Sequence, residues 1–440
     1  MQLPGPRGRT RPTLRIVRNP SLWYHRWLET YGDPFLVRAL NGDVVVTASE
    51  TNIKTIFTAR PHVFGAFASE TMRSLLGEGV ILAMSGSAHL RERKLLLPPF
   101  HGARMRAYGE QIIGVAERLS ASMMGSERFL ALEVGREISR EVILRAVFGV
   151  DDVHEVEETA VALSEYVDAL HPLLFFSQRT HRSFLGRGPW ARLQRRSTVV
   201  DHLLYAQIHR RRALAAKGLK VGDDIMSMLL QARYEDGEQM RDRHLRDTLL
   251  TLLFAGHETT SVAIAWGLYH LYTHPNVLTR LREELAGLGD PSPDEIAELP
   301  YLKAVCQETL RMHPVVPDVV RMVREELELD GCTVPAGIGI SIPTCVVHSD
   351  PKIYPEPDRF RPERFLEAKP GMWSWLPFGG GHRRCIGAAF AMYELALVLA
   401  TIVRRYDVEV CESRPVVPKR RSLTMGPSTG VRMRRVCTIT

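Results

Sequence analysis

The hydrophobic and polar positions divide the chain into a long helical part and a smaller part built from strands. Residues 34–48 carry two apolar runs on either side of Asn41-Gly42-Asp43, which predicts a β-hairpin because these residues accept the positive φ of a tight turn. From about residue 50 to 315, apolar residues recur every three to four positions with few internal Pro or Gly, which predicts helices. After residue 320, the pattern predicts short strands, a Pro-rich irregular run from 350 to 384 and a helix from about 386 to 404.

Three segments lack a clean period. Residues 62–86 mix aromatic and aliphatic residues with glycines, as a long functional loop does, and the segment around 165–190 is similar. The first 20 residues or so are rich in Pro and Arg, and we expect them to be extended. Because no linker separates these parts, residues 1–440 are predicted to form a single, mainly α domain with a smaller β region.

Composition narrows the range of functions. Lys and Arg total 57 against 50 Asp and Glu, a net charge of +7, and no basic run alternates with aromatic residues, which argues against a nucleic-acid partner. The six cysteines form no CxxC pair and no disulfide spacing, so we expect a reducing compartment, the cytoplasm. The start of the chain has no apolar run that could serve as a signal peptide or membrane anchor, and we therefore expect a soluble protein.

A glycine-rich run with the sequence FGGGHRRCIG, residues 378–387, delivers Cys385 to the start of a predicted helix. Glycines let the backbone approach a flat cofactor, and free amides at a helix N-terminus stabilise a thiolate, which is the form that binds iron. Taken alone, the same run also fits a buried cysteine that follows a tight turn.

Polar residues interrupt a long apolar helix that is predicted from about residue 243 to 274. In its segment AGHETTSVAIAW, Glu258 and Thr259 stand among Leu, Ala and Val. Without any function, Thr259 would bond back to a carbonyl one turn earlier and Glu258 would face solvent. The His257-Glu258 pair does not mark a zinc peptidase, because a second His would be needed at position 261, which is Ser261.

These segments together resemble the cytochrome P450 family. The glycine-rich run is similar to the family's haem-binding signature, AGHETT to its oxygen-binding kink, and QETLRMHP to its ExxR element, in the family's order along the chain. The resemblance implies the mainly α cytochrome P450 fold, with haem b held between the Glu258 helix and the Cys385 loop. The signature positions are occupied by Phe378, Gly381, Arg383, Cys385 and Gly387.

The resemblance also implies roles for individual residues. Cys385 is the metal ligand, and Glu258 and Thr259 are the catalytic residues that pass protons during oxygen activation. A buried charge network that fastens the cysteine loop is formed by Glu308, Arg311 and Arg364. Besides the signature positions, the cofactor-binding residues are Ala255 and Gly256, which leave room for oxygen, and His89, Arg93 and Arg321, which with Arg383 suit haem propionates.

The implied reaction is the hydroxylation of a lipophilic small molecule, such as a terpenoid, steroid or fatty acid, with O₂ and electrons from a separate ferredoxin and ferredoxin reductase. We expect a monomer, with Arg384 as a docking candidate for an acidic ferredoxin. Two alternatives stay open, a peroxygenase or isomerase on the same fold and a haem-based sensor without turnover. The candidate substrate contacts are nearly all apolar: Phe64, Phe67, Leu75, Leu76, Val80, Ile81, Phe254, Val315, Val316, Val319, Val320 and Met425.

Overall fold

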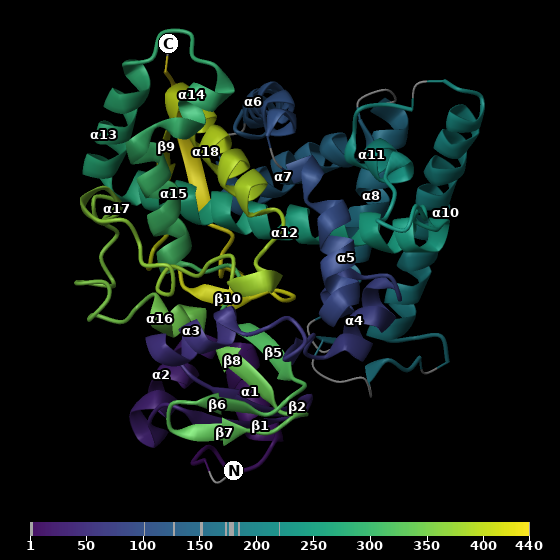
Figure 1. Cartoon of the computed structure of the whole chain (residues 1–440). Coiled ribbons are helices and arrows are strands. Elements are labelled where there is room, and N and C mark those ends of the chain that lie inside the picture. The colour runs from purple at the N-terminus through teal and green to yellow at the C-terminus, as the bar shows by residue number, and fades with distance from the viewer. Residues whose placement is uncertain are drawn as a thin grey trace.

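The computed structural model describes residues 3–100, 102–125, 128–149, 153–171, 174–175, 180–183, 185–219 and 221–439. It is mainly helical with small β-sheets, as predicted. Figure 1 shows the N-terminal β region at one end of the molecule, and the long helix α12 (Asp242–Thr273) crossing the helical part from side to side. The helix that the sequence predicts over residues 243–274 is thereby confirmed.

The main sheet has five strands in the order β1-β2-β8-β5-β3. Its strands are β1 (Phe35–Ala39), β2 (Gly42–Val46), β3 (Phe64–Gly65), β5 (Val319–Val323) and β8 (Gly339–Ile342). The predicted hairpin is confirmed: β1 and β2 pair antiparallel up to Ala39 and Gly42, and Gly42 has a φ of 134°. Because β8 pairs with β2 in parallel, strands from both ends of the chain share one sheet.

The extended N-terminus expected from the sequence is wrong for residues 10–18, which form helix α1 (Thr10–Arg18), followed by α2 (Pro20–Tyr31). The Thr13 hydroxyl donates to the Arg9 carbonyl at 2.7 Å and accepts the Leu40 N–H at 3.0 Å, which ties this helix to the hairpin. Pro12 lies in the first turn, where its missing N–H breaks no helical hydrogen bond.

The two predicted loops contain regular structure. Between residues 62 and 86 lie β3, helix α4 (Ser69–Leu76) and a 3₁₀ turn (Ile81–Ala83), elements too short to give a readable period. The segment around 165–190 includes the end of α8 (Val153–Ala169) and the start of α10 (Pro189–Ala216), and its residues 172–173, 176–179 and 184 lie outside the described residues.

The remaining helices pack around α12 or beside the β region (Figure 1). They are α3 (Glu50–Thr58), α5 (Gly86–Leu96), α6 (Ala103–Met123), α7 (Ala131–Phe148), α11 (Ile225–Gln231), α13 (Pro275–Ala286), α14 (Pro293–Glu298), α15 (Pro300–Met312), α16 (Thr344–Val347), α17 (Arg364–Glu367) and α18 (Ala388–Arg405). Helix α7 packs closely against α12 at two glycines, one on each helix. A Cβ on Gly135 would lie 2.8 Å from the Ser261 carbonyl oxygen, and one on Gly256 would lie 2.9 Å from Ile143 Cδ1.

Three smaller sheets complete the fold among the described residues. One has the order β4-β12-β9, with β4 (Arg128–Leu130), β12 (Arg432–Thr438) and β9 (Tyr406–Val410), and a second pairs β6 (Leu327–Leu329) with β7 (Cys332–Val334). The third is the hairpin of β10 (Pro418–Arg420) and β11 (Met425–Pro427). Its Met425 carbonyl accepts the Trp266 indole N–H at 3.3 Å, so this hairpin is attached to α12.

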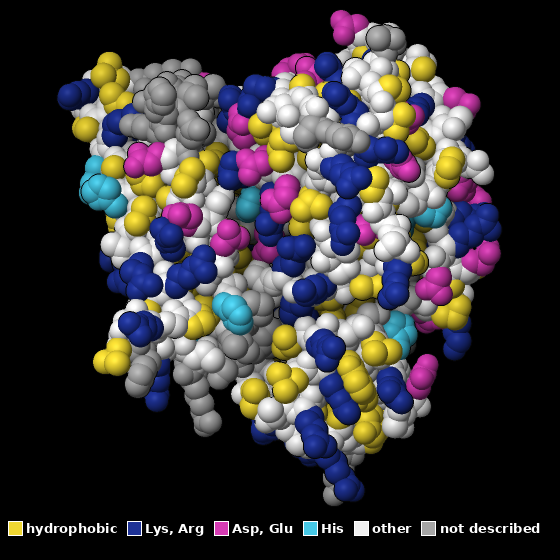
Figure 2. Space-filling view, turned by 180° about the vertical axis from the view of Figure 1, so that it is seen from behind, with side chains coloured by type: hydrophobic (Ala, Val, Ile, Leu, Met, Phe, Trp, Pro, Cys, Tyr) yellow, Lys and Arg dark blue, Asp and Glu magenta, His cyan; other side chains and the backbone are white. Residues whose placement is uncertain are grey.

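The surface is rich in charged groups. On the face shown in Figure 2, Lys and Arg side chains are spread over much of the surface, with Asp and Glu between them over its upper part. Within the described ranges, no helix is both long and apolar enough to cross a membrane.

Candidate active site

Cys385 lies between a 3₁₀ turn (Gly381–Arg383) and the N-terminus of α18. Its N–H donates to the Phe378 carbonyl at 2.9 Å, which closes the loop. The residue keeps accessible surface, although the protein atoms around it desolvate the thiol and raise its pKa. The Gly387 N–H and the charges of Arg384 and Arg93 act in the opposite direction and lower this pKa, which favours the thiolate.

Two glycines of the loop meet different surroundings. Gly381 has a φ of 64°, and a Cβ there would lie 2.6 Å from the Phe57 carbonyl oxygen, so only glycine fits this position. A Cβ on Gly387 would meet no protein atom within 4 Å. The second glycine is therefore not required by the protein's own packing, and it leaves space beside the sulfur.

Glu308 and Arg311 form a buried ion pair on α15. Arg311 Nε donates to Glu308 Oε2 at 2.7 Å, and Arg364 Nε donates to Glu308 Oε1 at 3.0 Å. The carboxylate is fully buried and both guanidinium groups are almost so, in contrast to the exposed pair that i,i+3 spacing usually gives. Every charge in the network has a hydrogen-bonded partner. This is required because a buried charge without a partner would strongly destabilise the folded protein.

His348 connects this network to the cysteine loop. Its Nε2 accepts the Leu376 N–H at 2.7 Å, and its Nδ1 lies 3.1 Å from the Arg311 carbonyl oxygen, to which it donates. Burial, followed by the charge of Arg311, lowers the His348 pKa to about 3, so the ring is neutral. Leu376 precedes the glycine-rich run by two residues, so the ion-pair network fixes where that run begins.

Beside the cysteine loop, five basic side chains crowd together: His89, Arg93, Arg321, His382 and Arg383. Within the described ranges, no carboxylate forms an ion pair with any of these three arginines, whose hydrogen bonds go to the carbonyls of Arg384, Val320, Met84 and Leu82. Burial and the neighbouring charges lower the pKa of His89 to about 3 and that of Arg321 to about 9. His89 Nδ1 and His382 Nε2 are buried without a described hydrogen-bond partner.

Such a cluster is electrostatically incomplete, because buried charges normally occur in opposite pairs. A ligand that carries two carboxylates and a flat body would supply the missing charge and cover the open space at Gly387. Haem would meet both requirements: Cys385 would supply a thiolate ligand to its iron, and these arginines would bind its propionates. His382 was not among the predicted site residues, although its position inside the glycine-rich run could have indicated it.

On α12, Thr259 and Glu258 point to different partners. The Thr259 hydroxyl donates to the Ala255 carbonyl at 2.7 Å. Glu258 is buried, in contrast to the solvent-facing alternative, and it accepts hydrogen bonds from the hydroxyls of Ser422 at 2.6 Å and Thr424 at 3.2 Å. Ala255 is exposed within an otherwise buried segment, so it faces open space. No sequence signal pointed to Ser422 or Thr424, which are more than 160 residues away.

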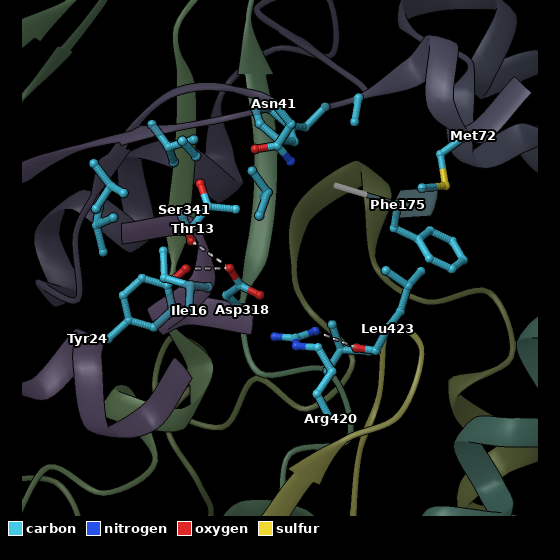
Figure 3. A pocket seen from close by; sticks show the side chains of 18 residues that line it. Thr13, Ile16, Tyr24, Asn41, Met72, Phe175, Asp318, Ser341, Arg420 and Leu423 are labelled. Atoms are coloured by element: carbon cyan, nitrogen blue, oxygen red, sulfur yellow. Dashed lines mark hydrogen bonds between the residues drawn. The ribbon is translucent and has the colours of Figure 1, made fainter. Parts of the chain in front are cut away.

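A cavity of about 270 Å³ lies between the main sheet, α1, α4 and the β10–β11 turn (Figure 3). One end is polar: Asp318 accepts hydrogen bonds from the Tyr24 hydroxyl at 2.8 Å and the Ser341 hydroxyl at 3.2 Å, and Arg420 lies at the same end. Apart from Thr13 and Asn41, apolar side chains form the rest of the lining, among them Ile16, Phe67, Met72, Phe175, Val316 and Leu423.

Three of the predicted substrate contacts, Phe67, Val316 and Val320, line this cavity. Three others do not face open space, because Phe64, Leu76 and Val80 expose 1%, 0% and 0% of their surface and belong to the core. The other predicted contacts are partly or fully buried away from this lining: Leu75, Ile81, Phe254, Val315, Val319 and Met425. Phe254 reaches the cavity indirectly, through a stacking contact with Phe175 at 6.4 Å between ring centroids.

This arrangement of a thiolate loop, an ExxR network and an acid-alcohol pair on a central helix defines a haem-thiolate oxygenase. The sequence model described as cytochrome P450 matches residues 14–431, and the chain belongs to the cytochrome P450 family. It is a cytochrome P450 monooxygenase, which uses haem, O₂ and electrons from redox partners to act on a small-molecule substrate.

Individual relatives agree with this assignment. The chain is similar to cytochrome P450 135B1 of Mycobacterium tuberculosis, with 36% identity over 98% of this chain and 90% of that protein. Cytochrome P450 137 of the same organism is 35% identical over 93% of this chain and 84% of its own length. Among solved structures, retinoic acid-bound cyanobacterial CYP120A1 superposes with a TM-score of 0.88 over 99% of this chain and 100% of that chain, and at 23% identity it supports the fold.

Proposed function

We propose that this cytochrome P450 hydroxylates a lipophilic small molecule with one polar group, of the size of a terpenoid, steroid or fatty acid. The observation that carries the proposal is the cavity, whose lining is mostly apolar and has a polar end formed by Tyr24, Asp318, Ser341 and Arg420. An apolar lining stabilises a hydrocarbon body, and a few fixed polar groups orient it. A substrate of this kind would present its hydrocarbon part to the apolar side chains and its polar group to Asp318 or Arg420.

We further propose roles for the site residues. Haem b, when bound by Cys385 and the basic cluster, supplies the oxygen chemistry. Thr259 and Glu258 would move protons, because their hydroxyl and carboxylate are exchangeable groups one turn along α12 from Ala255, which faces open space. The buried network of Glu308, Arg311 and Arg364 has no access to the substrate and keeps the cysteine loop in place.

The electron donor that we propose is a ferredoxin with its reductase, in a cytoplasmic setting, and the enzyme would act as a monomer. Arg384 is exposed next to Cys385, and its side chain forms no ion pair with any described residue. Its charge is available to an acidic ferredoxin, whereas Arg383 donates to the carbonyls of Met84 and Leu82.

A spectral titration tests the substrate class. Ferric protein is mixed with sesquiterpenes, steroids and fatty acids while the Soret band is followed, and a saturable low-to-high-spin shift identifies a compound that displaces the distal water. Phe67→Ala should weaken the affinity of that compound about tenfold or more, because it removes a large apolar contact. Val417→Ala, at an exposed position outside the lining, is the control.

Turnover distinguishes the two alternatives. With ferredoxin, its reductase and NADPH, a monooxygenase converts the shifting compound to a product with one added oxygen atom. Product formed only with peroxide would identify a peroxygenase, an isomeric product would identify an isomerase, and binding without any product would indicate a sensor. A protein that shifts with polar compounds alone would contradict the lipophilic substrate.

A further inference from the structure

The turn between β10 and β11, residues 421–424, has two functional faces. On one face, Leu423 lines the cavity, as Figure 3 shows. On the other face, the buried hydroxyls of Ser422 and Thr424 hold the Glu258 carboxylate. Neighbouring residues of one short turn therefore contact the substrate cavity and the proposed proton-transfer carboxylate.

The hydroxyls hold Glu258 apart from Thr259. Ser422 Oγ lies 2.6 Å from Glu258 Oε2, a short hydrogen bond of the kind a charged acceptor makes. Thr259 instead donates to its own helix at Ala255, and among the described residues no hydrogen bond joins it to Glu258. The two groups that must cooperate in proton transfer are thus not connected in this arrangement.

The turn is closed by its own hydrogen bonds and is also held at its flanks. Within it, the Arg421 N–H donates to the Thr424 carbonyl at 3.0 Å and Arg420 Nη1 donates to the Leu423 carbonyl at 3.4 Å. On one side, Met425 donates its N–H to the Val315 carbonyl at 2.8 Å, and its carbonyl accepts from Trp266. On the other side, Arg420 Nε donates to the Val17 carbonyl at 3.0 Å. Because these bonds make the turn one unit, a ligand that presses on Leu423 also shifts the hydroxyls of Ser422 and Thr424, and a hydrogen bond weakens steeply with such a displacement.

The Arg421 guanidinium lies near the Glu258 carboxylate and interacts with its charge. Burial and then the charge of Arg136 lower the pKa of Arg421, whereas the charges of Glu133 and Glu258 act in the opposite direction. Arg421 Nε is buried and has no hydrogen-bond partner among the described residues. The Arg421 side chain packs against Gly426 of β11, where a Cβ would lie 2.9 Å from Arg421 Nε. The guanidinium is therefore in contact with the hairpin that carries Ser422 and Thr424.

We propose that Ser422 and Thr424 are positioning residues that hold Glu258 away from Thr259, and that a ligand in contact with Leu423 releases the carboxylate. This inference rests on the proposed role of Glu258 in proton transfer. It makes oxygen reduction depend on substrate, because without protons from Glu258 the electrons are not used. The wasteful reaction that it suppresses is the reduction of O₂ by two electrons and two protons to H₂O₂.

The test uses haem-loaded protein without substrate. In the Ser422→Ala/Thr424→Val double variant, Glu258 is free, so substrate-free NADPH oxidation and H₂O₂ release with a surrogate ferredoxin and reductase should rise about tenfold, as the loss of hydrogen bonds to a charged group predicts. The C–O stretching band of the dithionite-reduced CO complex, which reports distal polar groups without turnover, should also shift. Ser422→Thr retains a hydroxyl and should resemble the unmodified protein.

A second variant imitates an occupied cavity. Leu423→Trp fills the space with the added ring and presses on the turn, so it should give the same rise and the same CO shift without any ligand. Val417→Trp adds that ring at an exposed position outside the lining and serves as the control. A thiolate-type CO spectrum in each variant verifies that the protein is folded.

Different results identify which idea fails. Unchanged H₂O₂ release and an unchanged CO band in the double variant would overturn the positioning role of Ser422 and Thr424. Adding Glu258→Gln to the double variant should abolish its increase. If Glu258→Gln has no effect on product formation in the unmodified protein, the proposed proton transfer fails instead, whatever the double variant does.

Discussion

His348 Nε2 accepts the backbone N–H of Leu376 at 2.7 Å, which joins the buried Glu308–Arg311 ion pair to the segment that leads into the cysteine loop. Trp375 adds a second connection, because its indole N–H donates to the Gln307 carbonyl at 3.2 Å. The ion pair on α15 therefore determines the position of the haem-binding loop through backbone hydrogen bonds, without contact with the cysteine itself.

Arg311→Gln should lower the free energy of unfolding by about 3–5 kcal/mol, because it leaves the Glu308 charge buried with Arg364 as its only charged partner among the described residues, beside the Arg361 N–H. Arg359→Gln is a matched control: Arg359 also pairs with a glutamate three residues earlier, but both side chains are more than 60% exposed. Its loss should cost at most about 1 kcal/mol. Urea denaturation and the rate of haem loss measure both variants, and equal effects would contradict the role of burial.

Cys385→Ala should abolish the thiolate-type spectrum of the ferrous CO complex, because the backbone amide of Gly387 and the charges of Arg384 and Arg93 stabilise the thiolate only at that position. The exposed Cys411, directly after β9, offers a control, since Cys411→Ala changes a cysteine outside the glycine-rich loop. A retained thiolate spectrum in Cys385→Ala would rule out this cysteine as the iron ligand.

Two glycines of the same loop should respond differently to alanine. Gly381→Ala should destabilise the protein by about 2–4 kcal/mol with or without haem, because a Cβ meets the Phe57 carbonyl at 2.6 Å and φ is 64°. Gly387→Ala should leave the stability of haem-free protein within about 0.5 kcal/mol of its original value, since no atom lies within 4 Å, yet it should accelerate haem loss. If Gly387→Ala destabilised haem-free protein as much as Gly381→Ala does, Gly387 would be required for folding and not for haem binding.

The sequence allowed the long helices to be predicted, because α12 and α18 carry continuous periodic patterns. It could not reveal α4, since an eight-residue helix has too few repeats to establish a period. The same limit applies to the cavity. Phe64 and Phe67 are equally apolar, yet one lies in the core and the other lines the cavity, and only the pairing of β3 with β5 separates them.

Residues joined across long separations were the hardest to foresee. Ser422 and Thr424 contact Glu258 because Met425 is hydrogen-bonded to Val315 and Trp266, and no local pattern encodes those contacts. In contrast, Glu308, Arg311 and Arg364 were identified by resemblance to the family, and the structure brings all three together.

Arg321→Gln should have opposite effects on two measurements. Removing one cation from a cluster that no described carboxylate neutralises should stabilise haem-free protein by about 1–2 kcal/mol. The same change removes a proposed propionate partner, so haem should leave faster. Urea denaturation of haem-free protein and haem transfer to apomyoglobin measure the two effects, with Arg38→Gln, at an exposed position, as the control. If Arg321→Gln instead destabilised haem-free protein, the basic cluster would not be one that requires a bound anionic ligand to balance its charge.

His348 should make the protein sensitive to acid. Its folded-state pKa of about 3 lies below the unfolded value near 6.5, so between these two pKa values the unfolded chain binds a proton that the folded protein does not. The stability that the neutral ring contributes is therefore fully present above the unfolded pKa and is lost as the pH falls towards 3. His313, whose pKa burial also lowers to about 3, adds to the same loss.

In His348→Gln, which cannot titrate, the free energy of unfolding in urea should fall less steeply between about pH 6.5 and pH 4. An identical slope in the variant would mean that His348 is not held neutral in the folded protein.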